Sequence, residues 1–536
     1  MEKDPSLSEA AASHVLDQVI EKGRLVETEK IYTTPVHLQR EQEILQQLSN
    51  GRTTDKILAD PALGQKLAQT SLNPEQKQAV SHILSTEQAI VGIQGYAGTG
   101  KSFMLNSAIA LATEQQKDVV LLAPYGAQVK SLKDDGMDAS TLASFLNSPK
   151  RQDAIGKDSV VIVDESGVIN TKQMHQLLKI AEQQQAKVVL LGDVAQTKAV
   201  DAGSPFKLMQ QHGMPTVTLS NIQRQKEPEL KKAVVEAAYH RPEQSLKHLK
   251  HIAQIKDRHQ RHEMIAEQYS QLTEDERKNT IVVSGRNIDR QDINQRIRDK
   301  LHLTGTGIQV DQLKRTQNTA AELTAVRTYK PGQYIEFVRE PKNKQFSKGE
   351  SYLINQVDDR FIYVTDNTGK AQAINPKQQA LNLYDKDKIE LSNNDIIRVM
   401  HGEKEKDITT GDILKVIKAT EKQIIGEDNK GNQHSFDSSK PLHLDHAYAM
   451  TVHSSQGLTV DRVIVNMDTK SRTTNKDVFY VAVSRARHEA YIYTDDNQQL
   501  PSAIRRESHK YNAHELMKKQ QDNEMENLFK HDYSRH

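Results

Sequence analysis

Short, unbroken runs of apolar residues, set apart by longer polar stretches with a helical pattern, constrain the fold of this chain more than any other feature. A strand with one face in water alternates apolar and polar residues, whereas an unbroken run is typical of a strand buried on both faces, as in a parallel sheet covered by helices. We therefore predict an α/β fold with two blocks of parallel sheet. The runs are residues 89–93, 119–123, 160–163, 188–191, 281–283, 463–465 and 491–493.

The order of these runs divides the chain, whose 536 residues are enough for several domains. The first four runs form one block, and the last three form a second block that is interrupted by a stretch rich in turns and strands. A helical lead-in precedes both blocks, and a charged, Gln-rich tail follows them. The predicted division is 1–70 for the helical region, 71–215 for the first sheet domain, 216–325 and 443–498 for the two parts of the second, 326–442 for the insertion and 499–536 for the tail.

The insertion contains an internal repeat. Gly349 and Gly411 lie 62 residues apart, as do Gly369 and Gly431, and similar strand patterns surround each pair. Two small, SH3-like β-barrels of the same build would produce this period. The alternative is two unrelated β-meanders.

Composition narrows the functional classes. Lys and Arg number 72 and Asp and Glu 71, so the net charge is +1 and any nucleic-acid surface has to be a local groove. The chain has no Cys, which excludes disulfides, thiolate metal sites and cysteine nucleophiles. It also lacks an apolar run of the roughly 18 residues that a membrane span needs, and we expect a cytoplasmic protein.

Residues 95–102, with the sequence GYAGTGKS, match the phosphate-loop pattern GxxxxGK[ST]. They follow an apolar run and precede a helical stretch, which is the order of strand, loop and helix that this motif requires. Its Gly residues let backbone N–H groups wrap around phosphate oxygens, while Lys101 neutralises the β and γ phosphates and Ser102 binds Mg²⁺. We therefore predict a site for ATP and Mg²⁺; the alternative is a Gly-rich turn. The nucleotide-binding residues are Gly95, Gly98, Thr99, Gly100, Lys101 and Ser102.

Two acidic residues follow the run at 160–163. Asp164 and Glu165 lie at the carboxyl end of a predicted strand, where open α/β sheets bind their ligands. Asp164 would hold Mg²⁺ through water and Glu165 would polarise the attacking water, although without a phosphate loop such a pair is more often a helix cap. The next strand is followed by Gln196, whose amide would lie near the γ-phosphate as a sensor.

In this order, the motifs resemble those of superfamily 1 helicases, in particular the RecD-like branch called SF1B. The resemblance implies that the two sheet blocks are RecA-like motor domains. Residues 72–80 are similar to the family's adenine-reading segment, which makes Gln76 the implied base contact. The segments that begin at Ala123 and Ser140 are similar to motifs that hold single-stranded DNA. The DNA contacts implied there are Pro124, Tyr125 and Thr141.

The second sheet domain carries two implied arginine fingers. The segment NIQRQ resembles the one whose Arg reaches the γ-phosphate, which assigns this role to Arg224. Gln223 stands where the family commonly has an aromatic residue that stacks on adenine. The segment 478–494 carries the second finger, Arg485, for which the alternative is a surface cation pair with Arg487. Fingers from a separate domain stabilise the transition state only when the cleft closes, which couples hydrolysis to motion.

Residues 449–465 resemble the motif that joins DNA contacts to nucleotide state. The first residues of this motif lie on the DNA side in the family and the later ones lie nearer ATP. The resemblance therefore implies DNA contacts at Thr451, His453 and Ser454, and nucleotide contacts at Gln456 and Gly457.

Several segments, among them 94–102 and 453–463, resemble the helicase part of TraI-type conjugative relaxase helicases. This implies an ATP-dependent helicase and translocase that moves 5′ to 3′ on single-stranded DNA in conjugative plasmid transfer, with a relaxase as a partner. The chain lacks the His triplet of the nicking domain in such proteins, and we expect no nicking activity. His259 with His262, and His509 with His514, have the spacing of one helix face, which we interpret as a solvated polar face.

Two other functional classes stay open. The chain would also fit an ATP-driven switch that binds DNA without processive unwinding, or a scaffold that binds single strands for a partner relaxase. The complete set of Lys101, Glu165, Arg224 and Arg485 counts against both. An RNA substrate stays open as well, because backbone contacts do not reveal whether a 2′-hydroxyl is read.

Overall fold

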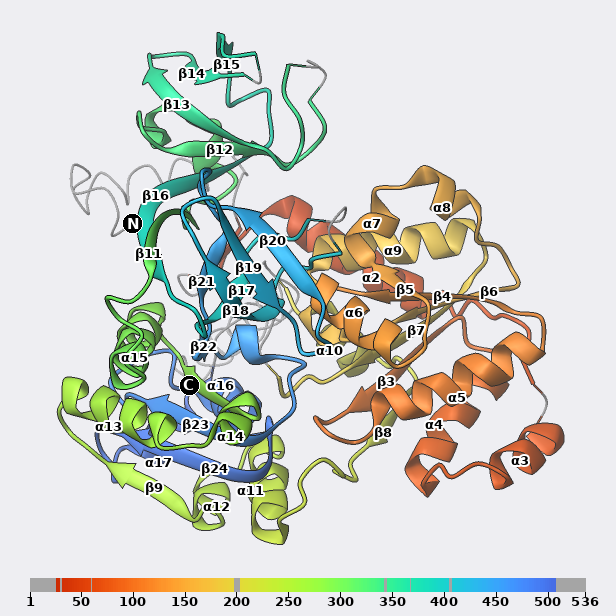
Figure 1. Cartoon of the computed structure of the whole chain (residues 1–536). Coiled ribbons are helices and arrows are strands. Elements are labelled where there is room, and N and C mark those ends of the chain that lie inside the picture. Colours follow the sequence, from red (N-terminus) through yellow and green to blue (C-terminus); the bar gives the residue numbers. More distant parts are fainter. Residues whose placement is uncertain are drawn as a thin grey trace, which may run out of the picture. The chain divides into compact units, whose positions relative to one another are not determined.

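The computed structural model describes residues 26–28, 31–58, 60–196, 203–341, 345–366, 368–403 and 407–507. The chain forms two compact units (Figure 1). The first comprises the residues up to Gln254 and those from Ser455 onward, and the second comprises Ile255–Ser454. The domain boundaries predicted from the sequence stay predictions. Within the described residues, none of the helices has the length and apolar character needed to cross a membrane.

A six-stranded parallel sheet forms the centre of the first unit. Its strands follow the order β5-β4-β6-β7-β3-β8, and every neighbouring pair is parallel. The four apolar runs of the first block form β3, β4, β6 and β7, so the predicted α/β class with buried parallel strands is confirmed. The bounds are β3 Ile90–Gly95, β4 Asp118–Ala123, β5 Ala139–Thr141, β6 Ser159–Val163, β7 Lys187–Gly192 and β8 Thr216–Leu219.

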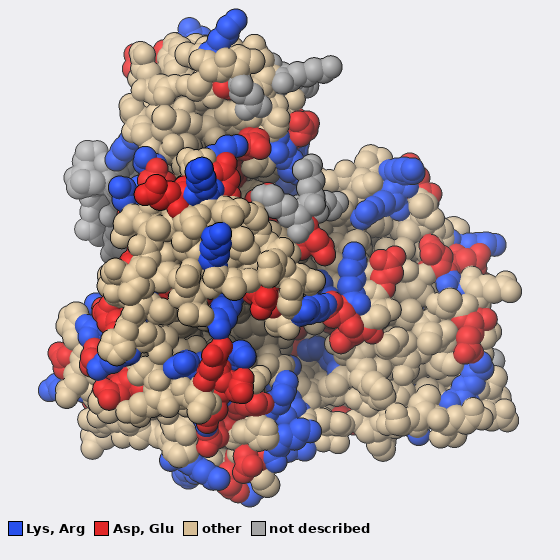
Figure 2. Space-filling model, in the orientation of Figure 1, with Lys and Arg blue, Asp and Glu red and all other residues tan. Residues whose placement is uncertain are grey.

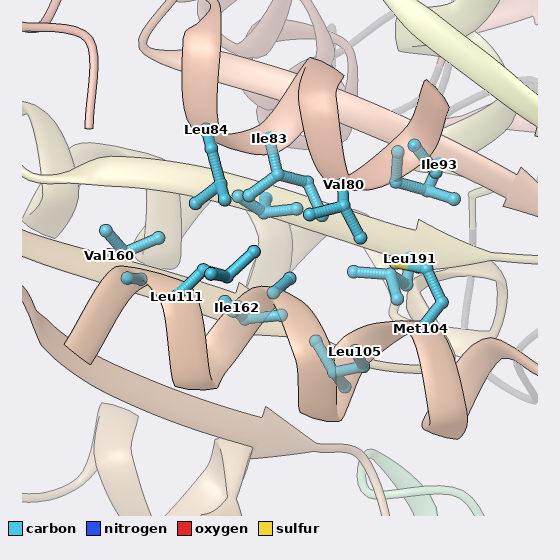
Figure 3. Packing of buried hydrophobic residues seen from close by; sticks show 14 of the residues in the cluster. Val80, Ile83, Leu84, Ile93, Met104, Leu105, Leu111, Val160, Ile162 and Leu191 are labelled. Atoms are coloured by element: carbon cyan, nitrogen blue, oxygen red, sulfur yellow. The ribbon is translucent and has the colours of Figure 1, made fainter. Parts of the chain in front are cut away.

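Helices cover both faces of this sheet and create one apolar core on each side. Val160 and Ile162 of β6 pack into one core, while Val161 and Val163 of the same strand pack into the other. Figure 3 shows the first core, in which side chains from α4 and α5 meet those of the strands. Burial on both faces is the reason that these strands read as unbroken apolar runs. The helices are α4 Pro74–Ser85, α5 Lys101–Glu114, α6 Gly126–Asp134, α7 Leu142–Leu146, α8 Pro149–Asp153, α9 Thr171–Gln183 and α10 Pro205–Gln211.

The N-terminal part of the first unit is mainly helical, as predicted, but it also contains a hairpin. The strands β1 (Val26–Thr28) and β2 (Ile31–Thr33) pair antiparallel. The helix α2 (Pro35–Ser49) begins after Thr34, whose side chain accepts a hydrogen bond from the backbone N–H of His37. A second helix, α3 (Asp60–Ala68), follows.

The first unit also contains three parallel strands of the second sheet block, one from its first part and two from its second part. β23 (Val460–Met467) pairs with β24 (Ala486–Thr494), and β24 pairs with β9 (His251–Gln254). The runs predicted at 463–465 and 491–493 therefore lie in β23 and β24. The accompanying helices are α11 Pro228–Ala238, α12 Pro242–Lys247, α16 Lys476–Val483 and α17 Leu500–Arg505.

The second unit begins with a helical layer and two parallel strands, β10 (Thr280–Ser284) and β22 (Ala449–Thr451). His262 is fully buried and its Nδ1 lies 2.5 Å from the carboxylate of Asp292, so the interpretation as a solvated face is wrong for His262, although His259 is exposed. His509 and His514 lie outside the described residues. The helices are α13 Arg258–Ser270, α14 Glu274–Lys278 and α15 Asn287–Lys300.

Two antiparallel sheets follow in the second unit, and they repeat one arrangement. The first has the order β11-β16-β12-β13-β14-β15 and the second has the order β21-β17-β18-β19-β20. The bounds are β11 Ile308–Arg315, β12 Tyr334–Phe337, β13 Ser351–Val357, β14 Ile362–Thr365, β15 Ala371–Ile374, β16 Leu381–Leu391, β17 Ile396–Val399, β18 Ile413–Ala419, β19 Gln423–Glu427, β20 Gln433–Asp437 and β21 Leu444–His446.

The two sheets match in detail. The register shifts between Ile354 and Gln356 in β13, and again between Val416 and Lys418 at the corresponding place in β18. The paired glycines of the sequence repeat all lie in turns with positive φ, for example 87° at Gly349. A shared strand order and a shared irregularity favour a true repeat over two unrelated meanders. Closure of either sheet into a barrel stays a prediction.

Candidate active site

The phosphate loop joins β3 to α5 at the carboxyl edge of the first sheet. Gly100, the residue before α5, has φ 79° and ψ 35°, a left-handed conformation that Gly adopts without the steric penalty of a side chain. The ammonium group of Lys101 folds back and donates a hydrogen bond of 2.8 Å to the carbonyl of Gly95. The loop therefore holds its lysine at the helix N-terminus, where backbone N–H groups attract phosphate.

Gln76 supports this loop from α4. Its side-chain amide donates to the carbonyls of Thr99 at 3.0 Å and Gly100 at 3.4 Å. Its side-chain oxygen accepts from the backbone N–H of Asn73 as part of a capping box. Gln76 thus positions the phosphate loop, while its contact with an adenine base stays a prediction.

The two carboxylates predicted for Mg²⁺ and water lie directly after β6. Burial and, to a lesser extent, the neighbouring charge of Glu165 raise the pKa of Asp164 to about 6, although the ammonium of Lys101 opposes this rise. Glu165 has φ 50°, a left-handed conformation that is uncommon for a residue with a side chain and is found at functional sites. A nearby cation would favour the ionised form of this buried carboxyl; that Asp164 and Ser102, in the first turn of α5, hold Mg²⁺ stays a prediction.

Asp193 follows β7 and collects hydrogen bonds beside the two carboxylates. It accepts from the side-chain amides of Gln94 at 3.2 Å and Gln196 at 3.1 Å, and from the backbone N–H of Ala195 at 3.0 Å. Burial raises its pKa, and the charge of Lys101 with the bonds from Ala195 and Gln196 opposes the rise. The predicted sensor Gln196 is therefore held by Asp193, and its contact with a γ-phosphate stays a prediction.

Tyr480, on α16, connects this cluster to the phosphate loop. Its hydroxyl accepts a hydrogen bond of 2.7 Å from the backbone N–H of Ala97 and donates one of 2.9 Å to Asp193. Sequence reasoning missed Tyr480 as a site residue. The available signal was a single hydroxyl in the otherwise apolar stretch VFYVAV, because a buried Tyr hydroxyl needs a partner.

Arg224 lies against the phosphate loop. The carbonyl of Gly98 accepts hydrogen bonds from the backbone N–H of Gln223 at 2.7 Å and of Arg224 at 3.2 Å. The guanidinium of Arg224 donates to the carbonyl of Ser484 at 2.9 Å. Burial lowers its pKa to about 9, and the positive charge of Arg485 acts in the same direction. The structure therefore brings the two predicted fingers together beside the loop.

Arg485 is 2% exposed, which excludes a surface cation pair for this residue. It donates to the carbonyls of Val481 at 2.9 Å and Leu458 at 3.3 Å, and to the hydroxyl of Ser484 at 3.0 Å. Burial lowers its pKa, and the charge of Glu165 is among the groups that oppose this. Buried Arg485 and Asp164 and partly buried Arg224 and Glu165 thus share one region, which is suited to stabilising charge that develops on a phosphoryl group.

Arg487 behaves differently from Arg485. Its side chain is about half exposed and lies 3.3 Å from the carboxylate of Asp461. The predicted surface cation is therefore Arg487 alone.

The predicted DNA contacts of the first block lie at one edge of the sheet. β4 and β5 pair so that Ala123 is opposite Thr141, which places Pro124 and Tyr125 next to Thr141. Tyr125 is 47% exposed, and an exposed aromatic ring at such an edge is suited to stacking on a base. The hydroxyl of Thr141 accepts from the backbone N–H of Ser144 and caps α7.

The remaining predicted contacts are divided between the two units. Thr451, His453 and Ser454 belong to the second unit, where the hydroxyl of Thr451 donates to that of Ser454 at 2.9 Å. Gln456 and Gly457 belong to the first unit, and Gly457 has φ 81°. The nucleic-acid and nucleotide roles of these five residues stay predictions.

Surface charge agrees with the near-zero net charge. On the face that Figure 2 shows, Lys and Arg are interspersed with Asp and Glu instead of forming one continuous basic area. Among the described residues of this face, a nucleic-acid surface would therefore be narrow.

Two family models match parts of the chain. The model described as an AAA domain matches residues 71–260, and the model of the UvrD-like helicase C-terminal domain matches residues 446–493. The first match contains the phosphate loop, both carboxylates and Arg224. The second contains Tyr480 and Arg485.

Curated conjugation proteins are similar over most of the chain. The multifunctional conjugation protein TraI of Escherichia coli K12 is 24% identical over 587 residues, with 95% of this chain and 32% of that protein covered. The conjugal transfer protein TraA of Rhizobium radiobacter is 25% identical over 424 residues, with 79% and 32% covered. The chain thus spans about a third of the length of these relatives.

Helicases are also among the similar proteins. The ATP-dependent RecD2 DNA helicase of Deinococcus radiodurans is 31% identical over 180 residues, with 32% of this chain and 24% of that protein covered. A solved structure of Pif1 helicases at forked duplex DNA has a TM-score of 0.47 and 16% identity, with 85% of this chain and 98% of that chain covered. The family models and the curated relatives confirm the predicted resemblance to superfamily 1 helicases of the RecD-like and TraI type.

Proposed function

We propose that this relative of the superfamily 1 helicases is an ATP-driven motor that moves on single-stranded DNA and unwinds duplex DNA during conjugative plasmid transfer. The observation that carries the proposal is the complete phosphate loop, which contacts both the segment of Arg224 and the helix of Tyr480. An ATP site that touches two further elements of the chain is suited to converting hydrolysis into movement.

The residues of the site divide the hydrolytic work. Lys101 and the loop N–H groups would bind the phosphates, and Ser102 with Asp164 would hold Mg²⁺, which neutralises charge on the β and γ phosphates. Glu165 would polarise the attacking water. Arg224 and Arg485 would stabilise the charge that develops in the transition state.

Coupling to movement would follow the backbone contacts of the loop. When the loop wraps around phosphate, the carbonyl of Gly98 and the N–H of Ala97 change position, and these groups are bonded to the segment of Arg224 and to Tyr480. Nucleotide binding would thus alter two elements that lie outside the first sheet. This is the arrangement that a stepping motor needs, and an inert scaffold would not need it.

The substrate and the partner follow from the relatives. Single-stranded DNA would stack on Tyr125 and contact Thr141, with Thr451, His453 and Ser454 as further contacts. The names of TraI and TraA place those proteins in conjugation. For this chain we infer the same process, travel in the 5′ to 3′ direction and a relaxase as the partner.

The first test compares ATP hydrolysis with and without single-stranded DNA in the intact chain, in Glu165→Gln and in Glu114→Gln. Glu114 is an exposed residue at the end of α5, so its variant controls for the loss of one charge. We expect DNA to stimulate hydrolysis in the intact chain and in Glu114→Gln but not in Glu165→Gln.

Other outcomes would redirect the proposal. Background hydrolysis with retained binding of single strands would favour the scaffold. Hydrolysis that DNA stimulates, without displacement of a strand from a 5′-tailed or a 3′-tailed duplex, would favour the switch. Equal stimulation by an RNA of the same sequence would refute specificity for DNA.

A further inference from the structure

Three side chains that can bind metal converge in the second unit, far from the ATP site along the chain. Glu336 belongs to β12 in the first antiparallel sheet, whereas His401 follows β17 and His443 precedes β21 in the second sheet. Their ligand atoms all lie within 4.8 Å of one another. The cluster therefore lies where the two repeated sheets meet.

Each carboxylate oxygen of Glu336 faces one imidazole. Oε1 lies 2.6 Å from Nε2 of His443, and Oε2 lies 3.3 Å from Nδ1 of His401. The two imidazole rings are 5.1 Å apart and tilted by 35°. In a tetrahedral zinc site with bonds of about 2.0–2.1 Å, neighbouring donor atoms are about 3.3 Å apart. The three donor atoms lie within 4.8 Å of one another, so the separation of each pair differs from the tetrahedral value by at most about 1.5 Å.

A second layer of hydrogen bonds fixes the carboxylate. The hydroxyls of Ser351 and Tyr384 each donate a bond of 2.7 Å to Glu336, one to each oxygen. Glu336 is only 1% exposed. Burial would raise its pKa, but the bonds from His401, His443 and Tyr384 more than offset this and hold the pKa well below its ordinary value. Glu336 is therefore a buried anion whose orientation is set by its neighbours, as in metal sites with an ordered outer layer.

We propose that Glu336, His401 and His443 bind a divalent transition-metal ion such as Zn²⁺, with water at the remaining position. Two imidazoles and one carboxylate favour zinc and its neighbours over Mg²⁺ and Ca²⁺, which prefer oxygen ligands. Three protein ligands leave one position open. The His401 side chain is 32% exposed, which provides a path for the ion.

The alternative is a hydrogen-bonded cluster in which protonated imidazoles neutralise Glu336. The hydrogen bond to Glu336 raises the pKa of His401 against the opposing effect of burial, which favours a proton on His401 in the metal-free cluster. A metal ion would replace that proton. Because the three ligands come from both sheets, the ion would also fasten the sheets together, and this role is independent of ATP hydrolysis.

The test uses the full chain, stripped of metal with a chelator and titrated with Zn²⁺ in the presence of excess Mg²⁺. The variants are His401→Ala and, as the matched control, His259→Ala, which removes an exposed histidine of the same unit. We expect the intact chain and His259→Ala to bind one more Zn²⁺ per chain than His401→Ala. Co²⁺ should give visible absorption bands of a tetrahedral site in the intact chain, and these bands should be absent from His401→Ala.

A second variant separates a metal site from a structural cluster. Tyr384→Phe removes an outer hydrogen bond but no ligand, so it should weaken Zn²⁺ binding about 10–100-fold without abolishing it. Far-ultraviolet circular dichroism would establish that each variant is folded. Equal Zn²⁺ stoichiometry in the intact chain and in folded His401→Ala, or Co²⁺ spectra that the variant leaves unchanged, would overturn the proposal.

Discussion

Replacing Tyr480 by Phe removes one oxygen atom from the point where the phosphate loop meets α16. That hydroxyl accepts from Ala97 and donates to Asp193, and the side chain has no exposed surface. Phe keeps the ring and leaves no cavity of consequence. The change therefore isolates the two hydrogen bonds.

The expected cost follows from these bonds. A neutral hydrogen bond contributes about 0.5–1.5 kcal/mol and one to a charged group about 1.5–3 kcal/mol. Asp193 retains its bonds from Gln94, Ala195 and Gln196, so the summed loss from the two hydrogen bonds of Tyr480 should lie in the lower part of these ranges. We expect the free energy of unfolding to fall by about 2–3 kcal/mol, which lowers the melting temperature of a unit of this size by roughly 3–4 °C.

Thermal unfolding followed by circular dichroism measures this shift, and steady-state ATP hydrolysis measures its functional effect. Tyr491→Phe is the control, because its hydroxyl lies on a partly exposed residue and makes a long bond of 3.3 Å to Glu489. We expect a small change in melting temperature for Tyr491→Phe and a reduced kcat for Tyr480→Phe. If both variants melt at the same temperature and hydrolyse ATP like the intact chain, the hydroxyl of Tyr480 does not couple the loop to α16.

Three further predictions concern single residues. Gly98→Ala should lower kcat for ATP hydrolysis at least tenfold, because φ of Gly98 is 82° and a Cβ there would lie 2.6 Å from Cβ of Arg224. A kcat within twofold of that of the intact chain would contradict this geometry. Burial lowers the pKa of Lys187 from 10.5 to about 8. Below pH 8 the folded chain therefore buries a charged ammonium group, which lowers the free energy of unfolding. This penalty is absent above about pH 10.5 and complete below about pH 8, so between pH 8 and 10.5 the unfolding free energy should rise by about 3 kcal/mol in denaturant titrations of the intact chain but not of Lys187→Met. Gly411→Ala should lower the melting temperature of the second unit, because φ is 103° there and a side chain costs roughly 1–3 kcal/mol; an unchanged melting temperature would show that the turn tolerates a side chain.

The parallel strands were predictable because their signal is local. A strand buried on both faces has to be apolar throughout, and each of the seven runs overlaps a strand of the structure. The repeat was also predictable from a local signal, because turns with positive φ favour Gly and its glycines recur in such turns. The hairpin of β1 and β2 was missed because strands of three residues carry almost no pattern.

Contacts between distant segments were not predictable in the same way. His262 is a polar residue type usually found at the surface, and its contacts with Asp289 and Asp292 on a neighbouring helix account for its burial. Tyr480 has no motif that links it to Ala97. In the ATP site, the motifs indicated the residue types and their order, whereas the bonds that hold Gln76 and Gln196 depend on the folded chain.

The matching strand orders of the two antiparallel sheets also affect how the chain reaches its fold. Backbone hydrogen bonds alone do not distinguish β13 from β18 as the neighbour of β12, so the two copies compete for the same partners while the chain is unfolded. During synthesis at about 5–20 residues per second, equivalent strands 62 residues apart emerge about 3–12 s apart. The first sheet therefore has seconds in which to pair before its competitor exists, whereas refolding from denaturant presents both copies at once. Production by the ribosome should yield less strand-exchanged, aggregation-prone material than refolding of the same chain.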